Sequence, residues 1–298
     1  MVNTDIERPP LYRGRFAPSP SGLLHFGSLV TALASYVDAK HNHGTWLVRI
    51  EDIDPPRALA GASNEILKTL ESFGLYWDEP VLYQSQQSLL YQKTLNDLAK
   101  KQLTYACKCT RAQIKDLGGI YPATCQYKNL PSEHNAIRLV NQVGIFEFTD
   151  NIQGHVSFNK SAAAEDFILV RKDNLFAYQL AVVVDDIFQN ITHVVRGCDL
   201  LEPTLRQLSF FNILQKNAPH YSHIPLAVTQ QGYKLSKQNN APAINNKNPQ
   251  PALIAALHYL GQNPPKTLVS NSVDTIIAWA IKHWSINKIT KNKEIVIQ

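Results

Sequence analysis

The chain has 298 residues, of which 44% are hydrophobic and 18% are charged, and its formal net charge is +5. This apolar content is enough for a sizeable core and excludes a wholly disordered chain. No apolar run approaches the ~18 residues that a membrane span requires, and the polar N-terminus lacks the apolar stretch of a secretory signal. We therefore expect a soluble, cytoplasmic protein with no membrane partner.

The first part of the chain alternates strand and helix patterns. A strand is predicted over 12–17, where prolines stop it, and a helix over 23–40 has apolar residues near helical spacing. A second strand is predicted over 45–50 and a second helix over 62–73. Strand, helix, strand and helix in this order are typical of a parallel α/β sheet.

The middle of the chain breaks this pattern. A helix is predicted over 86–101, and the glycines and prolines that follow make 105–133 irregular, so this segment is predicted to belong to an inserted subdomain. Short, mostly antiparallel strands are predicted over 137–140, 146–148 and 156–158.

The second half of the chain returns to buried patterns. The apolar runs 167–170 and 180–184 are predicted as strands, and 201–215 as a helix. An Asn/Pro-rich loop or linker over 238–250 and helices near 251–260 and 272–284 complete the chain.

The charge is unevenly distributed along the chain. Residues 1–218 hold 21 Lys/Arg against 22 Asp/Glu, whereas residues 219–298 hold 8 against 2. A basic end beside a near-neutral body favours a polyanionic partner such as nucleic acid. A solvated basic face without a partner is the alternative.

The first candidate site combines a strand end, a turn of small residues and a helix start. Helix N-termini present free N–H groups and a positive dipole end to phosphate. Gly22 and Gly27 allow a ligand to approach the backbone, and His25, expected in the first helical turn, is placed to contact a nucleotide. The alternative is a Pro/Gly turn with a solvated histidine.

A second candidate is the segment Lys234-Leu-Ser-Lys-Gln238 beside Gly232. Its two lysines suit a mobile loop that closes on a polyphosphate and neutralises the charge on a leaving pyrophosphate. By itself this signal is weak, because Lys/Ser loops are common and usually only solvated.

Three cysteines, Cys107, Cys109 and Cys125, lie close together in sequence and predict a metal site before a disulfide. Structural zinc requires four ligands, so three thiolates leave one position for His134 or for water. Three unlinked thiols in an irregular loop are the alternative. Cys198 lies far away in sequence and is interpreted as a packing residue.

Together these motifs resemble the class I aminoacyl-tRNA synthetases. His25-Phe-Gly-Ser28 corresponds to their first signature and Lys234-Leu-Ser-Lys-Gln238 to their second. Ser28 and Gln238 depart from the usual endings, which are histidine and serine. Segments similar to the glutamyl/glutaminyl branch are RFAPSP at 15–20, RIEDIDPPR at 49–57, AYQLAVVVDD at 177–186 and VRGCDL at 195–200.

The resemblance implies an α/β fold: a Rossmann-like parallel-sheet catalytic domain with a zinc-binding insertion and a short helical C-terminal region. Only 60 residues follow Gln238, where ordinary glutamyl-tRNA synthetases carry a large anticodon-binding region. The chain is most similar to the truncated paralogues that attach glutamate to queuosine, the wobble base of tRNA(Asp). The predicted divisions are a flexible tail at 1–11, catalytic halves at 12–104 and 166–238, the insertion at 105–165, and a linker with the C-terminal helices at 239–298.

The same resemblance implies the glutamate site. Arg15 and Arg196 lie at the substrate's side-chain carboxylate, since arginine pairs with carboxylates through two hydrogen bonds, and Tyr178 adds a hydroxyl. Glu51 accepts from the α-ammonium group. Arg196 in a structural ion pair and Tyr178 in the core are the alternatives. The remaining glutamate contacts are assigned to Phe16, Ala17, Pro18 and Ser19.

For ATP, the resemblance implies His25, Gly27, Ser28 and Lys237, with His25, Lys234 and Lys237 as the catalytic residues. Mg²⁺ is expected to be bound mainly by ATP. One structural zinc per chain is implied on the three clustered cysteines with Tyr121 as the fourth ligand. Asp185-Asp186 is interpreted as structural or substrate-orienting, not as a metal site.

The implied reaction has two steps, with ATP, L-glutamate and queuosine-containing tRNA(Asp) as partners. ATP and glutamate first form glutamyl-adenylate, and a queuosine hydroxyl then attacks the activated carbonyl. One rival is a short glutamyl-tRNA synthetase that charges the 3′ end of tRNA. The other is a non-catalytic paralogue that only binds tRNA or nucleotide. The retained signature and pocket residues argue against it: Arg15, His25, Glu51, Lys234 and Lys237.

Overall fold

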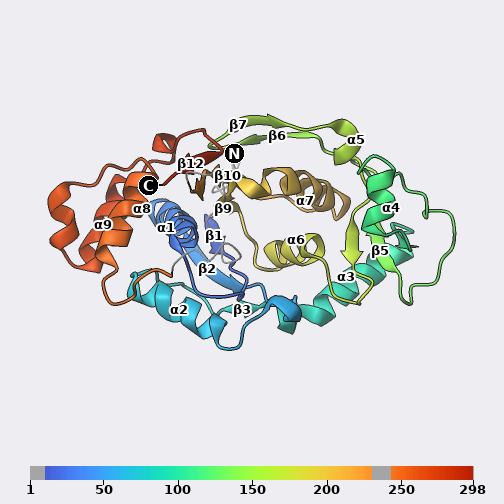
Figure 1. Ribbon diagram of the computed structural model, residues 1–298, viewed down its shortest axis with the longest axis horizontal. Coiled ribbons are helices and arrows are strands. Elements are labelled where there is room, and N and C mark those ends of the chain that lie inside the picture. The colour runs from blue at the N-terminus through green and yellow to red at the C-terminus, as the bar shows by residue number, and fades with distance from the viewer. Residues whose placement is uncertain (1–10, 230–242, 298) are drawn as a thin grey trace, which may run out of the picture.

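The computed structural model describes residues 11–229 and 243–297, and parallel strands lie at the centre of the protein (Figure 1). Strands β1 (Arg13–Phe16), β2 (Thr45–Ile50) and β3 (Leu82–Tyr83) form one parallel sheet, and β9 (His193–Gly197) pairs in parallel with β10 (His220–Ile224). The backbone N–H of Thr192, just before β9, donates to the carbonyl of Arg13 in β1 at 3.0 Å, so the two groups of strands lie side by side. These parallel pairings confirm the predicted parallel α/β fold.

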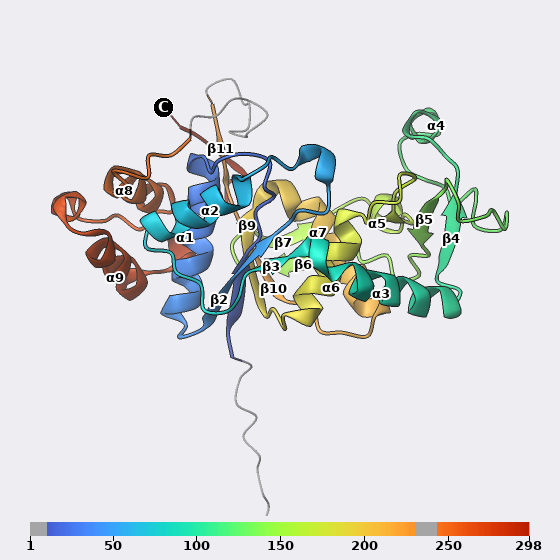
Figure 2. The ribbon, with the colours of Figure 1, turned by 90° about the horizontal axis from the view of Figure 1, so that it is seen from below.

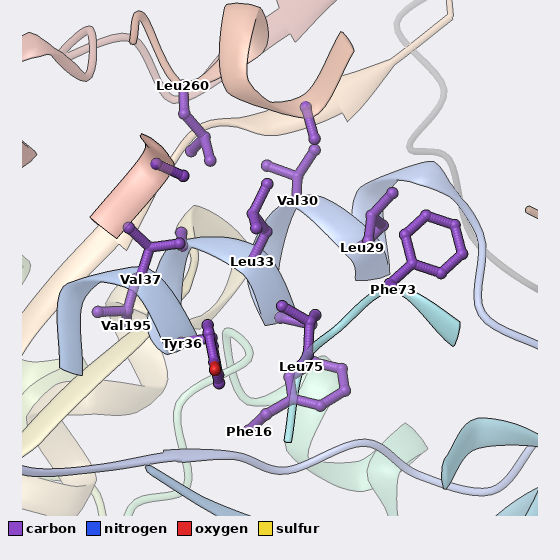
Figure 3. Packing of buried hydrophobic residues seen from close by; sticks show 14 of the residues in the cluster. Phe16, Leu29, Val30, Leu33, Tyr36, Val37, Phe73, Leu75, Val195 and Leu260 are labelled. Atoms are coloured by element: carbon purple, nitrogen blue, oxygen red, sulfur yellow. The ribbon is translucent and has the colours of Figure 1, made fainter. Parts of the chain in front are cut away.

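Helix α1 (Phe26–His41) connects β1 to β2 and lies inside the main core, where all residues from Ala32 to Ala39 are buried. It begins later than predicted. Gly22 has a φ of 141° and His25 is extended, so the residues before Phe26 are not helical. Figure 3 shows Leu29, Val30, Leu33 and Val37 of this helix among the side chains of Phe16, Leu75, Val195 and Leu260.

The part of the chain that follows α3 contains an antiparallel sheet of strand order β4–β5–β8 and a separate antiparallel hairpin, β6–β7. The strand predicted at 137–140 is β5 of the sheet, those predicted at 146–148 and 156–158 correspond to the hairpin, and β4 was not predicted. β8 (Ile168–Val170) pairs with β5, so the predicted strand at 167–170 belongs to this sheet and not to the parallel one. The other elements of this part are α3 (Ser88–Lys100), β4 (Thr104–Cys107), α4 (Arg111–Asp116), β5 (Ala136–Leu139), the antiparallel hairpin β6 (Glu147–Asp150) and β7 (Gly154–Ser157), and α5 (Lys160–Ala163).

The strand predicted at 180–184 is wrong, because these residues lie inside helix α6 (Tyr178–Phe188). Leu180 to Asp186 are all buried, so the apolar run lacks the polar face that would reveal a helical period. The neighbouring strands β9 and β10 were not predicted from the sequence. They include His193, Arg196, His220 and His223, and these polar residues obscure a strand pattern.

Helices α8 (Gln250–Tyr259) and α9 (Val273–His283) confirm the predicted C-terminal helices and pack against α1. They lie at the opposite end of the protein from α4 (Figures 1 and 2). Among the described helices, none combines the length and apolarity that crossing a bilayer requires. The remaining elements are α2 (Ala62–Ser72), α7 (Leu201–Ile213), the strand pair β11 (Leu226–Val228) and β12 (Glu294–Val296), and short 3₁₀ helices, among them η1 (Pro55–Arg57) and η2 (Gln84–Gln87).

Candidate active site

A cleft of about 400 Å³ opens at the N-terminal end of α1. His25 caps this helix and does not lie in its first turn as predicted, and its Nδ1 accepts from the backbone N–H of Ser28 at 3.3 Å. His25, Gly27 and Ser28 all line the cleft, together with Asp199 and Tyr259. The structure therefore brings together the described residues predicted for ATP.

Other predicted residues are arranged around the same cleft. Phe16 is the last residue of β1, and it lines the cleft together with Pro18 and Ser19. Ala17 lies between Phe16 and Pro18 in the sequence. The predicted catalytic residues Lys234 and Lys237 lie outside the described residues.

A second cavity, of about 570 Å³, adjoins the first. Ser19 and Ser21 line both spaces, so a ligand in one lies next to a ligand in the other. Glu51 and Tyr178, two of the residues predicted for glutamate, line this second cavity. An amino acid bound there would lie beside a nucleotide in the first cleft.

Arg15 is buried and paired with Asp186. Its Nε and Nη2 donate to the two oxygens of that carboxylate at 3.1 and 3.3 Å, and Arg49 donates to the same group at 2.5 Å. Asp185 accepts from Gln84 at 2.7 Å and from the hydroxyl of Tyr91. The two aspartates thus hold arginines and a helix in place, which agrees with a structural role.

Glu51 and Tyr178 lie in the same electrostatic environment as the two arginines. Burial raises the pKa of Glu51 to about 7, although the charges of Arg49 and Arg15 oppose this change. Burial also raises the pKa of Tyr178, against the effect of Arg196 and Arg15. Of the four residues predicted for the polar groups of glutamate, Glu51 and Tyr178 line the second cavity, whereas Arg15 and Arg196 are buried and do not line it. The charges of the two arginines nevertheless act on Glu51 and Tyr178, as these pKa shifts show.

Arg196 stands on β9 with 4% of its surface exposed. Its Nη2 donates to Thr204 and to Gln207, both at 2.7 Å, and its guanidinium lies 4.8 Å from the centre of the Tyr221 ring. Its Nη1 has no hydrogen-bond partner among the described residues. No carboxylate of the described chain forms an ion pair with Arg196, so the structural ion pair considered as an alternative is not found there.

The sequence patterns did not predict the polar network that surrounds Arg196. Its Nε donates to Nε2 of His223 at 3.1 Å, and Nδ1 of His223 contacts Asp150 at 2.6 Å. Both residues are buried and come from strands far apart in the chain. No motif marks them, because their roles depend on strand packing.

The three clustered cysteines form a compact group. The sulfur atoms of Cys107, Cys109 and Cys125 lie within 4.8 Å of one another, with 3.6 Å between the last two. Tetrahedral zinc with Zn–S bonds of about 2.3 Å places thiolates about 3.8 Å apart, so this spacing suits zinc. Although burial opposes it, the backbone N–H of Lys108 and neighbouring side chains lower the pKa of Cys125 to about 7, which favours the thiolate.

The hydroxyl of Tyr121 reaches this cysteine group and accepts from the backbone N–H of Cys125 at 3.0 Å. The ring is buried beneath the guanidinium of Arg138, at 3.7 Å from the ring centre. His134 is not part of the group and lines a separate cavity beside α3. Of the two side chains considered for the fourth position, Tyr121 is the one beside the thiols.

Comparisons with known proteins agree with this architecture. Residues 12–269 match the family described as tRNA synthetases class I (E and Q), catalytic domain. The chain is 60% identical to the Glutamyl-Q tRNA(Asp) synthetase of Colwellia psychrerythraea over 100% of both chains. It is 49% identical to the protein of that name from Escherichia coli O6:H1, over 94% of this chain and 91% of the relative. The crystal structure of glutamate-tRNA synthetase from Elizabethkingia anophelis superposes with a TM-score of 0.77 at 26% identity, covering 95% of this chain and 67% of that one.

Proposed function

Because the chain belongs to the tRNA synthetases class I (E and Q), a family of ligases, we propose that it activates glutamate with ATP and transfers it to queuosine in tRNA(Asp). The observation that supports glutamate is Arg196, a buried cation whose Nη1 has no partner among the described residues. A substrate carboxylate satisfies both that hydrogen-bonding group and that charge. The name that relatives carry at 49–60% identity supports queuosine as the acceptor.

In the first step, an oxygen of the α-carboxylate of glutamate attacks the α-phosphorus of ATP, and pyrophosphate leaves. Arg196 binds the side-chain carboxylate, with Tyr178 beside it, and Glu51 accepts from the ammonium group. Arg15 has two donors committed to Asp186, so it meets the substrate through its remaining N–H groups. Orientation of the two reactants carries this step.

The nucleotide lies in the cleft at the start of α1, where Gly27 offers its backbone N–H group and the helix offers its positive end to the phosphates. The backbone N–H of Ser28 donates to His25, so Ser28 contacts the nucleotide through its side chain. His25 contacts the phosphates or the ribose. Mg²⁺ bound to ATP supplies further neutralisation of charge when present. Lys234 and Lys237, outside the described residues, are assigned to the leaving pyrophosphate.

In the second step, a hydroxyl of the queuosine cyclopentenediol, which resembles a ribose cis-diol, attacks the activated carbonyl and AMP leaves. The cavity that holds Glu51 and Tyr178 is also lined by Arg57, Arg111 and Arg171. These arginines come from η1, α4 and the residue after β8. Arg57 and Arg171 pair with Asp54, which lines the same cavity, whereas Arg111 forms no ion pair among the described residues. Three arginines against this one lining aspartate suit an anionic nucleotide entering beside the glutamate site.

Two other functions compete with this proposal: one has a different acceptor for glutamate, and the other has no catalytic activity. A short glutamyl-tRNA synthetase would use the same glutamate site and charge the 3′-terminal adenosine. A non-catalytic RNA-binding protein has no need for Glu51 and Tyr178 in a cavity that adjoins a nucleotide cleft, nor for the buried cation Arg196. The relatives' name favours queuosine over the first rival, and these residues favour an enzyme over the second.

The proposed function is tested with labelled glutamate, ATP and full-length tRNA(Asp) that carries queuosine. We expect glutamate-dependent exchange of pyrophosphate into ATP, and label in the nuclease fragment that contains the wobble nucleotide. Label on the 3′-terminal adenosine would support the short glutamyl-tRNA synthetase instead. Absence of exchange would support the binding protein.

We expect the KM for glutamate in the exchange reaction to fall about tenfold between pH 6 and pH 8. With a pKa raised to about 7, Glu51 gains its negative charge as the pH rises through this range, while the ammonium group of glutamate stays protonated. Glu51→Gln should abolish this dependence and weaken binding at high pH. A pH dependence that survives in Glu51→Gln would assign the titrating group elsewhere.

Purified protein is expected to contain about one zinc per chain, held by the three cysteines and Tyr121 in a purely structural role. Cys109→Ser should lower the zinc content and loosen the insertion while the parallel sheet stays folded. Tyr121→Phe keeps the ring beneath Arg138 and removes only the hydroxyl, so it should speed zinc loss to a chelator. Metal analysis follows both variants, and unchanged retention in Tyr121→Phe would leave water as the fourth ligand.

Charge reversal of Lys282, Lys288 and Lys291 should weaken tRNA binding and reduce its salt dependence by roughly one unit per lost phosphate contact. All three are exposed near the C-terminal helices, in the basic part of the chain. Glutamate-dependent pyrophosphate exchange should survive. Reversal of three exposed lysines on α2 and α3, Lys68, Lys93 and Lys100, changes the net charge equally and serves as the control. Equal losses in both triple variants would mean that only net charge matters.

A further inference from the structure

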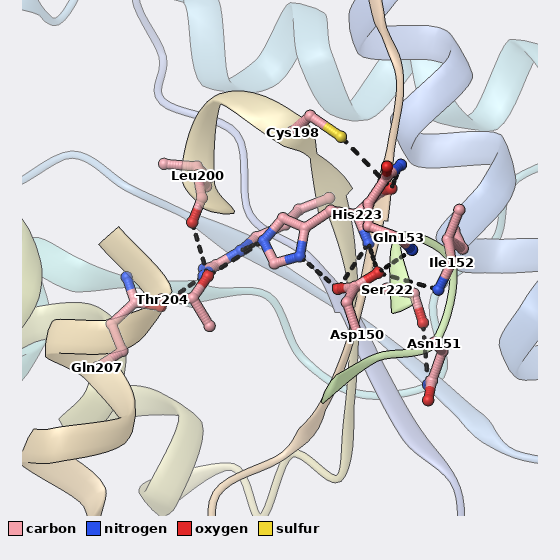
Figure 4. A network of polar contacts seen from close by, with 11 residues as sticks. Asp150, Asn151, Ile152, Gln153, Cys198, Leu200, Thr204, Gln207, Ser222 and His223 are labelled. Atoms are coloured by element: carbon pink, nitrogen blue, oxygen red, sulfur yellow. Dashed lines mark hydrogen bonds and ion pairs between the residues drawn. The ribbon is translucent and has the colours of Figure 1, made fainter. Parts of the chain in front are cut away.

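A buried chain of hydrogen bonds runs from Arg196 on β9 to His223 on β10 and on to Asp150 at the end of β6. Figure 4 shows the ring of His223 beside the carboxylate of Asp150. We propose that His223 and Asp150 are positioning residues, which hold the Arg196 guanidinium toward the glutamate side chain and so set the preference for glutamate over glutamine. This inference rests on the proposed function and assigns the selectivity of its amino-acid site.

The hydrogen bonds determine which nitrogen of His223 carries the hydrogen. A guanidinium Nε is always a donor, so Nε2 of His223, 3.1 Å from Nε of Arg196, must accept. The ring hydrogen is therefore on Nδ1, which donates to Asp150 at 2.6 Å. Burial and the charge of Arg196 lower the pKa of His223 to about 4, which agrees with a neutral ring.

The carboxylate of Asp150 is also fixed in orientation by hydrogen bonds. One of its oxygens accepts from the backbone N–H groups of Ile152 and Gln153, both at 2.9 Å. The backbone N–H of His223 donates to the same carboxylate at 3.1 Å. These bonds tie the imidazole to the turn between β6 and β7, so the acceptor that faces Arg196 has one orientation.

The other side of the guanidinium is also constrained. The hydroxyl of Thr204 donates to the carbonyl of Leu200 at 2.6 Å and therefore accepts from Nη2 of Arg196. The Gln207 carbonyl accepts from the same nitrogen. With Nε and Nη2 held in this way, Nη1 is the nitrogen left for a substrate.

A comparison of the two arginines explains the selectivity. Arg15 is paired directly with Asp186, so its positive charge is largely neutralised. The neutral imidazole of His223 separates Arg196 from Asp150, and so it orients the guanidinium without bringing a carboxylate against it. Arg196 therefore keeps an uncompensated charge in a buried place, which favours an acid over an amide.

The test compares His223→Leu with His223→Gln, whose side-chain oxygen can still accept from Arg196. His223→Leu should raise the KM for glutamate about tenfold or more and lower the glutamate-to-glutamine ratio of kcat/KM, with the KM for ATP unchanged. His223→Gln should retain most of the selectivity. Asp150→Asn, whose amide can donate to Nδ1 and move the ring hydrogen to Nε2, should also lower the ratio.

His193→Leu is the matched control, since this histidine also lies on the β9–β10 pair but stacks on Tyr12. It should leave the ratio unchanged. If the ratio is the same in wild type and His223→Leu, or if the leucine and glutamine variants lose it equally, the positioning role is overturned. Either of these results would overturn the positioning role but not the proposed function, because the wild-type protein would still activate glutamate. If the wild-type protein shows no glutamate-dependent exchange, both the proposed function and this inference are refuted.

Discussion

Replacing Arg196 with alanine is expected to lower kcat/KM for glutamate on the order of a hundredfold, because a buried charged partner of the substrate carboxylate is lost. The KM for ATP should stay unchanged, since the nucleotide cleft lies at the start of α1. Initial rates of pyrophosphate exchange at varied glutamate and varied ATP separate the two effects.

Arg206→Ala is the matched control for this change. Arg206 is a partly buried arginine on α7 that pairs with Glu165 at 2.9 Å, away from the residues assigned to glutamate. Its loss should reduce stability without a specific effect on glutamate. Unchanged glutamate kinetics in Arg196→Ala would remove Arg196 from the binding site.

An isolated anticodon stem-loop that carries queuosine is expected to accept glutamate, and the same stem-loop with guanosine at the wobble position is not. The proposed nucleophile is a hydroxyl of the cyclopentenediol, and guanosine lacks this group. The readout is acid-precipitable labelled glutamate at saturating ATP.

Removal of the 3′-terminal adenosine from full-length tRNA(Asp) controls for the other acceptor. Its removal should make no difference to the amount of glutamate attached. Loss of acceptance with that adenosine would identify the 3′ end as the acceptor, while leaving the glutamate site as proposed.

Local sequence was sufficient for much of the fold. The strand at 45–50 and the helix at 62–73 are in place as β2 and α2, because their apolar spacing and flanking turn residues are local properties. The run at 180–184 misled the prediction, since buried helices and buried strands both lack a polar face. The strands β9 and β10 were not predicted, because a buried polar residue interrupts the apolar pattern of each strand. These residues are Arg196 in β9 and His223 in β10.

The sequence by itself determined the family, the parallel α/β class and the candidate residues carried by contiguous motifs: the start of α1, Glu51, Tyr178, Arg196 and the three cysteines. The resemblance implied Tyr121 beside the cysteines while their spacing left His134 open, and the tertiary structure places Tyr121, and not His134, beside the thiols. It alone joined Asp150 and His223 to Arg196, and Asp186 to Arg15. The physical reason is that a motif records neighbours along the chain. The partners of a buried charge are instead selected by strand pairing and packing, which bring together residues distant in sequence whose hydrogen bonds must be satisfied away from water.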